Sequence, residues 1–174
     1  VVNSLKLMLD DLGPDDTIGI VTYAGSAGVA LEPVSASKKS KIIRALDSLG
    51  AGGSTAGAAG IRSAYDLADE AFIKDGNNRV ILATDGDFNV GISSADDLKD
   101  YIEKKRDKGI FLSVLGFGQG NYRDTTMQAL AQTGNGNAAY INDLSEARKV
   151  LVDEASSTLF TIAKDVKIQV EFNP

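Results

Sequence analysis

The 174-residue sequence contains no cysteine and no histidine, and each absence excludes a class of chemistry. Without cysteine the chain has no disulfide bond and no thiolate nucleophile. Without histidine it has no Ser-His-Asp catalysis, no imidazole general base and none of the usual nitrogen ligands of zinc and copper. Any metal bound by its side chains must therefore be a hard cation with oxygen ligands, such as magnesium or calcium.

Tryptophan is also absent and proline occurs only three times, whereas glycine occurs 18 times. A hydrophobic content of 43% is sufficient for the core of one domain. The formal charge of -6 disfavours contact with phosphate backbones, so we expect no nucleic-acid partner. No apolar run approaches the ~20 residues that span a bilayer, so we expect no direct membrane insertion from these residues.

Hydrophobic patterning predicts strands that alternate with helices. The predicted strands are 17–24, 29–34, 79–84, 110–118, 138–143 and 166–172, and the predicted helices are 1–12, 37–49, 57–73, 95–108, 123–133 and 144–163. Strands 79–84 and 110–118 are apolar on both faces, which is typical of a parallel sheet covered by helices. Pro33 marks 29–34 as an edge strand. The predicted fold is α/β: a doubly wound, mostly parallel open sheet, Rossmann-like, flanked by helices on both faces, with one antiparallel edge strand.

Helical spacing also predicts which side chains are buried. Leu5, Met8 and Leu9 share one face of the first helix. The helix 57–73 is expected to bury a stripe that includes Tyr65 and Phe72.

Two carboxylates stand directly after the apolar strand 79–84, where open α/β sheets bind their ligands. Asp85, Asp87 and Asn89 match positions of a calcium-binding EF-hand loop. That loop, however, requires a glycine where Val90 stands, and it follows a helix rather than a strand. A plain turn, in which Asp87 or Asn89 bonds nearby backbone amides, is the simplest alternative.

A magnesium-dependent phosphatase-like enzyme is another interpretation of Asp85 and Asp87. Carboxylates at this spacing can act as nucleophile and general acid around a magnesium ion, and the pattern resembles haloacid-dehalogenase-type phosphatases. In that family a Thr or Val stands where this chain has Asn89. The later acidic pair at a strand end is also missing, because Asp96 and Asp97 begin a predicted helix.

The glycine-rich stretch GAGGSTAGAAG, residues 50–60, carries Ser54 and Thr55. It has no Gly-Lys-Ser/Thr and follows a helix, so neither a P-loop nor a dinucleotide fingerprint is indicated. Its hydroxyls could cap the following helix. Alternatively, a hydroxyl from this loop and the carboxylate of Asp85 could converge on one hard cation.

The stretches DTIGIVTYAG, GGSTAGAAGI, VILATDGDFNVG and FLSVLGFG together resemble the von Willebrand factor A domain, and nearly the whole chain resembles uncharacterised bacterial proteins of this type. The resemblance implies a metal-ion-dependent adhesion site in which Thr55 and Asp85 bind Mg²⁺. It implies a protein-binding module rather than an enzyme, in which an acidic side chain of a partner protein fills an open coordination position. Expected rim residues are Ser54, Gly86, Asp87, Asn89, Asn121 and Tyr122.

The family's Asp-x-Ser-x-Ser segment is absent, and residues 1–12 resemble the helix that follows it. Thr55 and Asp85 alone cannot hold a six-coordinate ion tightly, so this chain by itself is expected to be metal-free or to bind metal weakly. We expect the missing segment upstream of Val1 in the intact protein. The resemblance also suggests a cell-envelope location.

The absent segment includes a strand that is central in the family's sheet, so two strands of this chain are expected to lack a ladder partner. Residues 166–172 of a second copy could fill that place, which would give a strand-exchanged homodimer. The predicted organisation is therefore a von Willebrand factor A domain at 1–165, lacking its first strand, and a strand at 166–174 that leads toward a further region.

Overall fold

The computed structural model describes residues 1–23, 28–50, 57–84, 95–118, 125–153 and 169. In these ranges the helices are α1 (Val2–Leu7), α2 (Lys39–Asp47), α3 (Gly57–Glu70), α4 (Ala95–Asp107), α5 (Thr125–Thr133) and α6 (Leu144–Arg148). A 3-10 turn, η1 (Met8–Asp10), follows α1, and a π-helical turn, η3 (Lys149–Asp153), follows α6.

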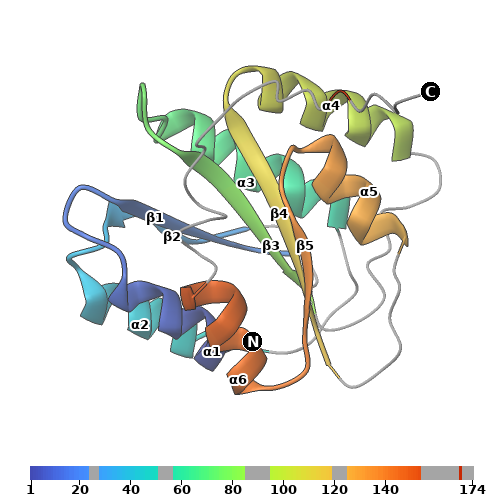
Figure 1. Cartoon of the computed structure of the whole chain (residues 1–174). Coiled ribbons are helices and arrows are strands. Elements are labelled where there is room, and N and C mark those ends of the chain that lie inside the picture. The colour runs from blue at the N-terminus through green and yellow to red at the C-terminus, as the bar shows by residue number, and fades with distance from the viewer. Residues whose placement is uncertain (24–27, 51–56, 85–94, 119–124, 154–168, 170–174) are drawn as a thin grey trace.

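The five described strands form two sheets. Strands β3 (Asn78–Thr84), β4 (Ile110–Phe117) and β5 (Ala138–Ile141) are parallel, with β4 in the middle. Strand β1 (Thr17–Thr22) pairs antiparallel with β2 (Gly28–Ser35) beside them (Figure 1). The predicted α/β class and the antiparallel strand near 29–34 are confirmed.

Helices cover both faces of the three-stranded sheet because β4 is apolar on both. Leu112 and Val114 face a core cluster built with residues of α3, α4 and α5. Leu115 and Phe117 alternate with them and face a second cluster, which includes side chains of α1, α6 and η3. Every residue of β4 is buried, as expected for a central parallel strand.

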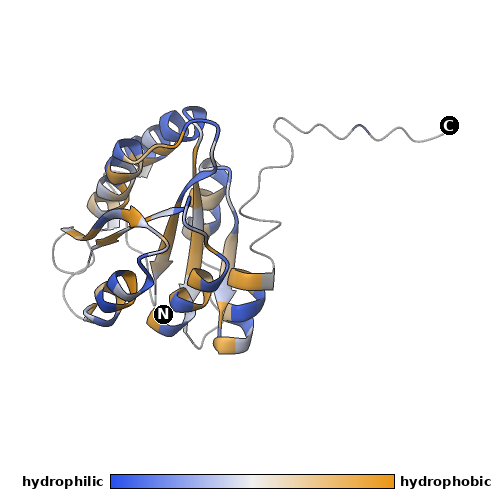
Figure 2. Ribbon diagram, turned by 90° about the vertical axis from the view of Figure 1, so that its left-hand side faces the viewer, coloured by the Kyte–Doolittle hydropathy of each residue, from blue (hydrophilic) through white to orange (hydrophobic). Residues whose placement is uncertain are grey.

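A third cluster lies under the two-stranded sheet, where Leu31 of β2 packs with Ile42 and Leu46 of α2 and with Leu9. Figure 2 shows the same division by hydropathy: apolar residues follow the strands, and the helices turn polar residues outward. The three apolar clusters thus join the helices to both sheets.

A gap in hydrogen bonding separates the two sheets. Among the described strands, β1 pairs only with β2, and β3 pairs only with β4. Helix α3 nevertheless contacts both β1 and β3. On the opposite face Leu5 packs with the cluster containing Ile18, while Met8 packs with the cluster containing Ile81. In the described part of the chain, no strand pairs with the facing edges of β1 and β3.

Some element boundaries differ from the predictions. The first helix changes from α to 3-10 geometry at Met8, whereas one helix was predicted over 1–12. The predicted helix 144–163 is observed as α6 and η3 up to Asp153, and its remainder lies outside the described residues. Of the predicted strand 166–172, only Gln169 is described, and it lies in no helix or strand.

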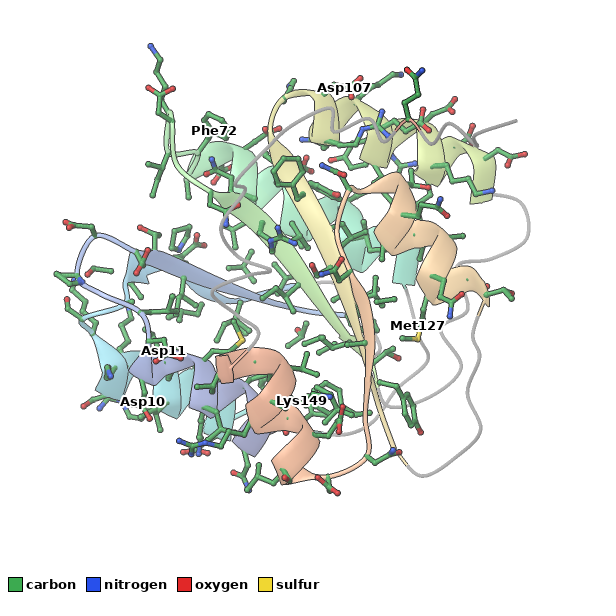
Figure 3. The ribbon with its side chains drawn as sticks, viewed as in Figure 1. Asp10, Asp11, Phe72, Asp107, Met127 and Lys149 are labelled. Carbon is green, nitrogen blue, oxygen red and sulfur yellow. The ribbon has the colours of Figure 1, made fainter. Side chains whose placement is uncertain are left out.

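The predicted burial of Phe72 is wrong, because its side chain is 41% exposed. Helix α3 ends at Glu70, so Phe72 no longer follows the buried face (Figure 3). The amide of Asn78 accepts a bond from the backbone N–H of Ile73 (2.9 Å) and donates one to its carbonyl (2.9 Å). These bonds hold the chain in a turn directly after the helix.

Candidate functional site

The residues that sequence analysis assigned to a metal site lie outside the described part of the chain. This is true of the expected ligands Thr55 and Asp85, and of the expected rim residues Ser54, Gly86, Asp87, Asn89, Asn121 and Tyr122. Their positions therefore remain predictions. The structure does describe the strands and helices that flank these residues in the sequence.

Strand β3 ends at Thr84, the residue that precedes Asp85. Thr84 is buried and pairs in register with Gly116 near the end of β4. Gly116 in turn pairs with Tyr140 of β5. The ends of β3 and β4 therefore lie at the same edge of the sheet, which we call the carboxyl edge. Open parallel sheets bind ligands at this edge.

The beginning of α3 lies at the carboxyl edge as well, and Tyr23 demonstrates this. The Tyr23 hydroxyl donates a hydrogen bond to the carbonyl oxygen of Ala83, one residue before the end of β3 (2.8 Å). A Cβ atom added to Gly60, in the first turn of α3, would lie only 2.4 Å from the Cβ of Tyr23. The end of β1, the end of β3 and the start of α3 therefore meet around one side chain.

The end of β4 is closely packed against α5 and β5. A Cβ atom on Gly116 would lie 2.8 Å from the methyl carbon of Met127, which Figure 3 labels on α5. The Tyr140 hydroxyl donates to the carbonyl of Gly118, and the N–H of Gly118 donates to Ile141 (3.3 Å). These contacts fix the residue from which the loop carrying Asn121 and Tyr122 departs.

A separate polar cluster joins α3 to α4, and the resolved tyrosine and lysine pKa shifts belong to it. Burial raises the pKa of the Tyr65 hydroxyl, and the nearby Tyr101 raises it further. The two rings meet edge to face with centroids 5.8 Å apart. The Tyr101 hydroxyl donates to Asp66 (2.8 Å), and the guanidinium carbon of Arg62 lies 4.7 Å from the centre of the Tyr101 ring.

The predicted donor pair, Thr55 and Asp85, suits a hard cation but is too small. A threonine hydroxyl and an aspartate carboxylate are oxygen ligands of the kind that magnesium prefers. Two side chains leave most of six coordination positions to water or to other protein groups. In the described ranges no group of three or more acidic side chains could hold a metal ion.

Tyr23 and Gly60 are the residues of this edge that sequence reasoning missed. Tyr23 reads as the end of a β-branched and aromatic strand, and Gly60 as an ordinary small residue in a helix. A glycine at the end of a glycine-rich stretch, inside a helix, is a weak signal of close packing. The partner that approaches it cannot be identified from the sequence.

Comparisons with known proteins agree with this architecture. A family model described as von Willebrand factor type A domain matches residues 1–154. A second model, for the C-terminal region of the uncharacterized protein YfbK, matches residues 157–174. The uncharacterized protein YfbK of Escherichia coli (strain K12) is 50% identical over 174 residues, which are 100% of this chain and 30% of that protein. The chain thus spans about a third of the length of this relative.

Solved structures with low identity share the fold. A von Willebrand factor type A protein from Catenulispora acidiphila superimposes with a TM-score of 0.73 at 18% identity, over 89% of this chain and 36% of that one. Proximal thread matrix protein 1 from the mussel byssus, in a structure with a zinc-occupied MIDAS motif, gives a TM-score of 0.62 at 23% identity, over 87% of this chain and 38% of that one. In the described helices none is long and apolar enough to cross a membrane.

Proposed function

Because the chain belongs to the von Willebrand factor type A domain family, we propose that it is a protein-binding module whose carboxyl edge holds a divalent cation in the intact protein. The bound cation would supply a positive charge with an open position for a carboxylate oxygen of a partner protein. The observation that carries the proposal is the meeting of β1, β3 and α3 around Tyr23. In the sequence, Thr55 stands two residues before α3, and Asp85 directly follows β3. Both therefore stand next to elements that meet around Tyr23.

Thr55 would bind the cation through its hydroxyl oxygen, and Asp85 directly or through a water molecule. The neighbouring Ser54, Gly86, Asp87, Asn89, Asn121 and Tyr122 would form the rim that contacts the partner. A charge-assisted bond at the centre would fix the docking register, and the rim would determine specificity. The mussel protein, whose structure has a zinc-occupied MIDAS motif, supports a divalent cation in a protein of this fold.

Thr55 and Asp85 do not fill the coordination sphere of the cation, so other residues must supply the remaining ligands. We propose that they lie on a strand that occupies the gap between β1 and β3, and that residues upstream of Val1 supply it. The carbonyl of Ala83 accepts its bond from Tyr23 across the gap. Backbone groups alternate along a strand, so those of Ile81 and Arg79 point to the same side as Ala83. That side is the free edge of β3 among the described strands.

The proposal is tested by measuring Mn²⁺ affinity by isothermal titration calorimetry in the full-length protein. Asp85→Ala should weaken binding at least about tenfold, or about 1.4 kcal/mol, because it removes the only anionic ligand of the pair. Asp15→Ala is the matched control. Asp15 is exposed, and no hydrogen bond or ion pair joins it to another described residue.

Equal Mn²⁺ affinity in the wild type and in Asp85→Ala would contradict the metal site. The phosphatase-like alternative with Asp85 and Asp87 has its own outcome: hydrolysis of p-nitrophenyl phosphate that requires magnesium and is abolished by Asp85→Ala. A binding module should show no such hydrolysis. Binding of an acidic peptide in Mg²⁺, lost in EDTA, would support carboxylate capture.

A further inference from the structure

Tyr23 lies where the end of β1, the end of β3 and the start of α3 meet. It follows the last residue of β1, and it precedes the loop at 24–27. Its hydroxyl is bonded to Ala83, two residues before Asp85. Its Cβ and ring lie against Gly60, five residues after Thr55. A single side chain thus spans the distance from the start of α3 to the end of β3.

Both of its contacts limit relative movement of those two elements. The hydrogen bond of 2.8 Å is short enough to fix the position of the Ala83 carbonyl relative to the ring. Against Gly60 the packing leaves no space, because an added Cβ would lie 2.4 Å from Tyr23 Cβ and 3.0 Å from Cγ. The backbone of α3 therefore rests directly on Tyr23, without an intervening side chain.

We propose that Tyr23 is a positioning residue that sets the separation between the loop carrying Thr55 and the strand end carrying Asp85. The inference rests on the proposed function, because those two side chains are its expected cation ligands. Removing the hydroxyl leaves the ring against Gly60 but removes the bond that ties the end of β3 to Tyr23. The ligands then have a wider range of separations, and the cation loses affinity because binding must restrict them again.

The bond from Tyr23 is compatible with a strand in the gap between β1 and β3. A backbone carbonyl oxygen has two lone pairs, so Ala83 can accept from the tyrosine hydroxyl and from a ladder N–H together. The ring also packs against the cluster shared by α3 and β3, which lies on one face of the sheet rather than within its plane. The proposal therefore applies to the full-length protein.

The chain supplies a matched control in Tyr65. This tyrosine is on α3 itself and fully buried, but among the described residues its hydroxyl has no hydrogen-bond partner. Tyr65→Phe and Tyr23→Phe make the same chemical change in the same part of the core. Only Tyr23→Phe removes a bond to the strand that leads into Asp85.

The experiment measures Mn²⁺ affinity by calorimetry in the full-length protein for the wild type, Tyr23→Phe, Tyr65→Phe and Asp85→Ala. Loss of one neutral hydrogen bond should weaken binding in Tyr23→Phe roughly threefold to tenfold. Tyr65→Phe should stay within about twofold of the wild type, since no bond is lost. Thermal unfolding by circular dichroism shows whether each variant is folded at the titration temperature.

Wild-type affinity in Tyr23→Phe, while Asp85→Ala is weakened, would overturn the positioning role and leave the metal site intact. An equal loss of Mn²⁺ affinity in Tyr65→Phe would also overturn the positioning role. Removal of any tyrosine hydroxyl from the core would then have the same effect. No difference between the wild type and Asp85→Ala would overturn the metal site itself and the positioning role with it.

Discussion

The ammonium nitrogen of Lys105 on α4 lies 3.4 Å from a carboxylate oxygen of Asp66 on α3. The same nitrogen forms an ion pair with Asp69, one turn further along α3. The Lys105 side chain is only 10% exposed, whereas those of Asp66 and Asp69 are 66% and 33% exposed. A largely buried cation therefore joins the two helices through acids that remain accessible to water.

Lys105→Met should lower the free energy of unfolding by about 1–2 kcal/mol. Methionine keeps the apolar stem but removes the charge, and both acids can be hydrated again, which limits the loss. Lys99→Met is the control, because the Lys99–Asp96 pair is exposed and 4.0 Å long and should contribute less than ~0.5 kcal/mol. Urea denaturation of both variants at pH 7 measures the difference, and equal losses would contradict the assignment.

The raised pKa of the buried Tyr65 hydroxyl predicts a loss of stability at alkaline pH. Its folded pKa is raised, first by burial and then by Tyr101, while in the unfolded chain it ionises near the usual value of about 10. Above about pH 10 the unfolded state releases a proton that the folded state retains. The free energy of unfolding should therefore fall by up to about 1.4 kcal/mol per pH unit from this group.

Urea titrations at pH 8, 10 and 11 should show a smaller alkaline loss in Tyr65→Phe than in the wild type, with similar stability at pH 8. Lys105 also lowers the stability of the fold at alkaline pH, and it does so equally in the wild type and in Tyr65→Phe. Burial alone lowers the pKa of Lys105, but Asp69 and Tyr101 raise it above the usual lysine value. Its contribution is therefore present below about pH 10.5 and is lost at higher pH. Parallel alkaline losses in the two proteins would show that Tyr65 ionises normally in the fold.

The fold could be predicted from local pattern because its central strands leave little ambiguity. The apolar stretches at 79–84 and 110–118 predict strands buried on both faces, and the structure pairs them in parallel. The carboxyl edge could be predicted for the same reason, because parallel strands bring their ends together whatever follows them.

Contacts between distant segments could not be predicted in this way. Tyr23 contacts Gly60 and Ala83, which lie 37 and 60 positions further along the chain. Nothing in the sequence around Gly60 or Ala83 indicates that Tyr23 is the residue they contact. The exposure of Phe72 was missed for a local reason. Helical periodicity continues past Glu70, but the turn held by Asn78 ends the helix first.

Gly60→Ala should destabilise the protein although it lies inside a helix. In an exposed helix the substitution would add roughly 1 kcal/mol of stability. Here the new Cβ would lie 2.4 Å from Tyr23 Cβ, so the end of β1 or the start of α3 must move. Overpacking of this kind costs about 1–3 kcal/mol.

Gly50→Ala is the control for Gly60→Ala, because a Cβ at Gly50 would meet nothing within 4 Å. Chemical denaturation should show a net loss for Gly60→Ala and a change within about 0.5 kcal/mol for Gly50→Ala. A stabilised Gly60→Ala would mean that Tyr23 does not rest against α3 in solution.

The facing edges of β1 and β3 predict that the 174-residue chain, without further residues, associates with a second copy of itself. Unpaired strand edges are templates for another strand, and 166–172 has the alternation of one. If a second copy's 166–172 fills the gap, sedimentation velocity should show a dimer of the 174-residue chain and a monomer after deletion of 166–174. Deletion of 173–174 alone should leave the dimer intact. A chain that stays monomeric at about 100 μM, or a dimer that survives the longer deletion, would exclude strand exchange as the way in which the gap is filled.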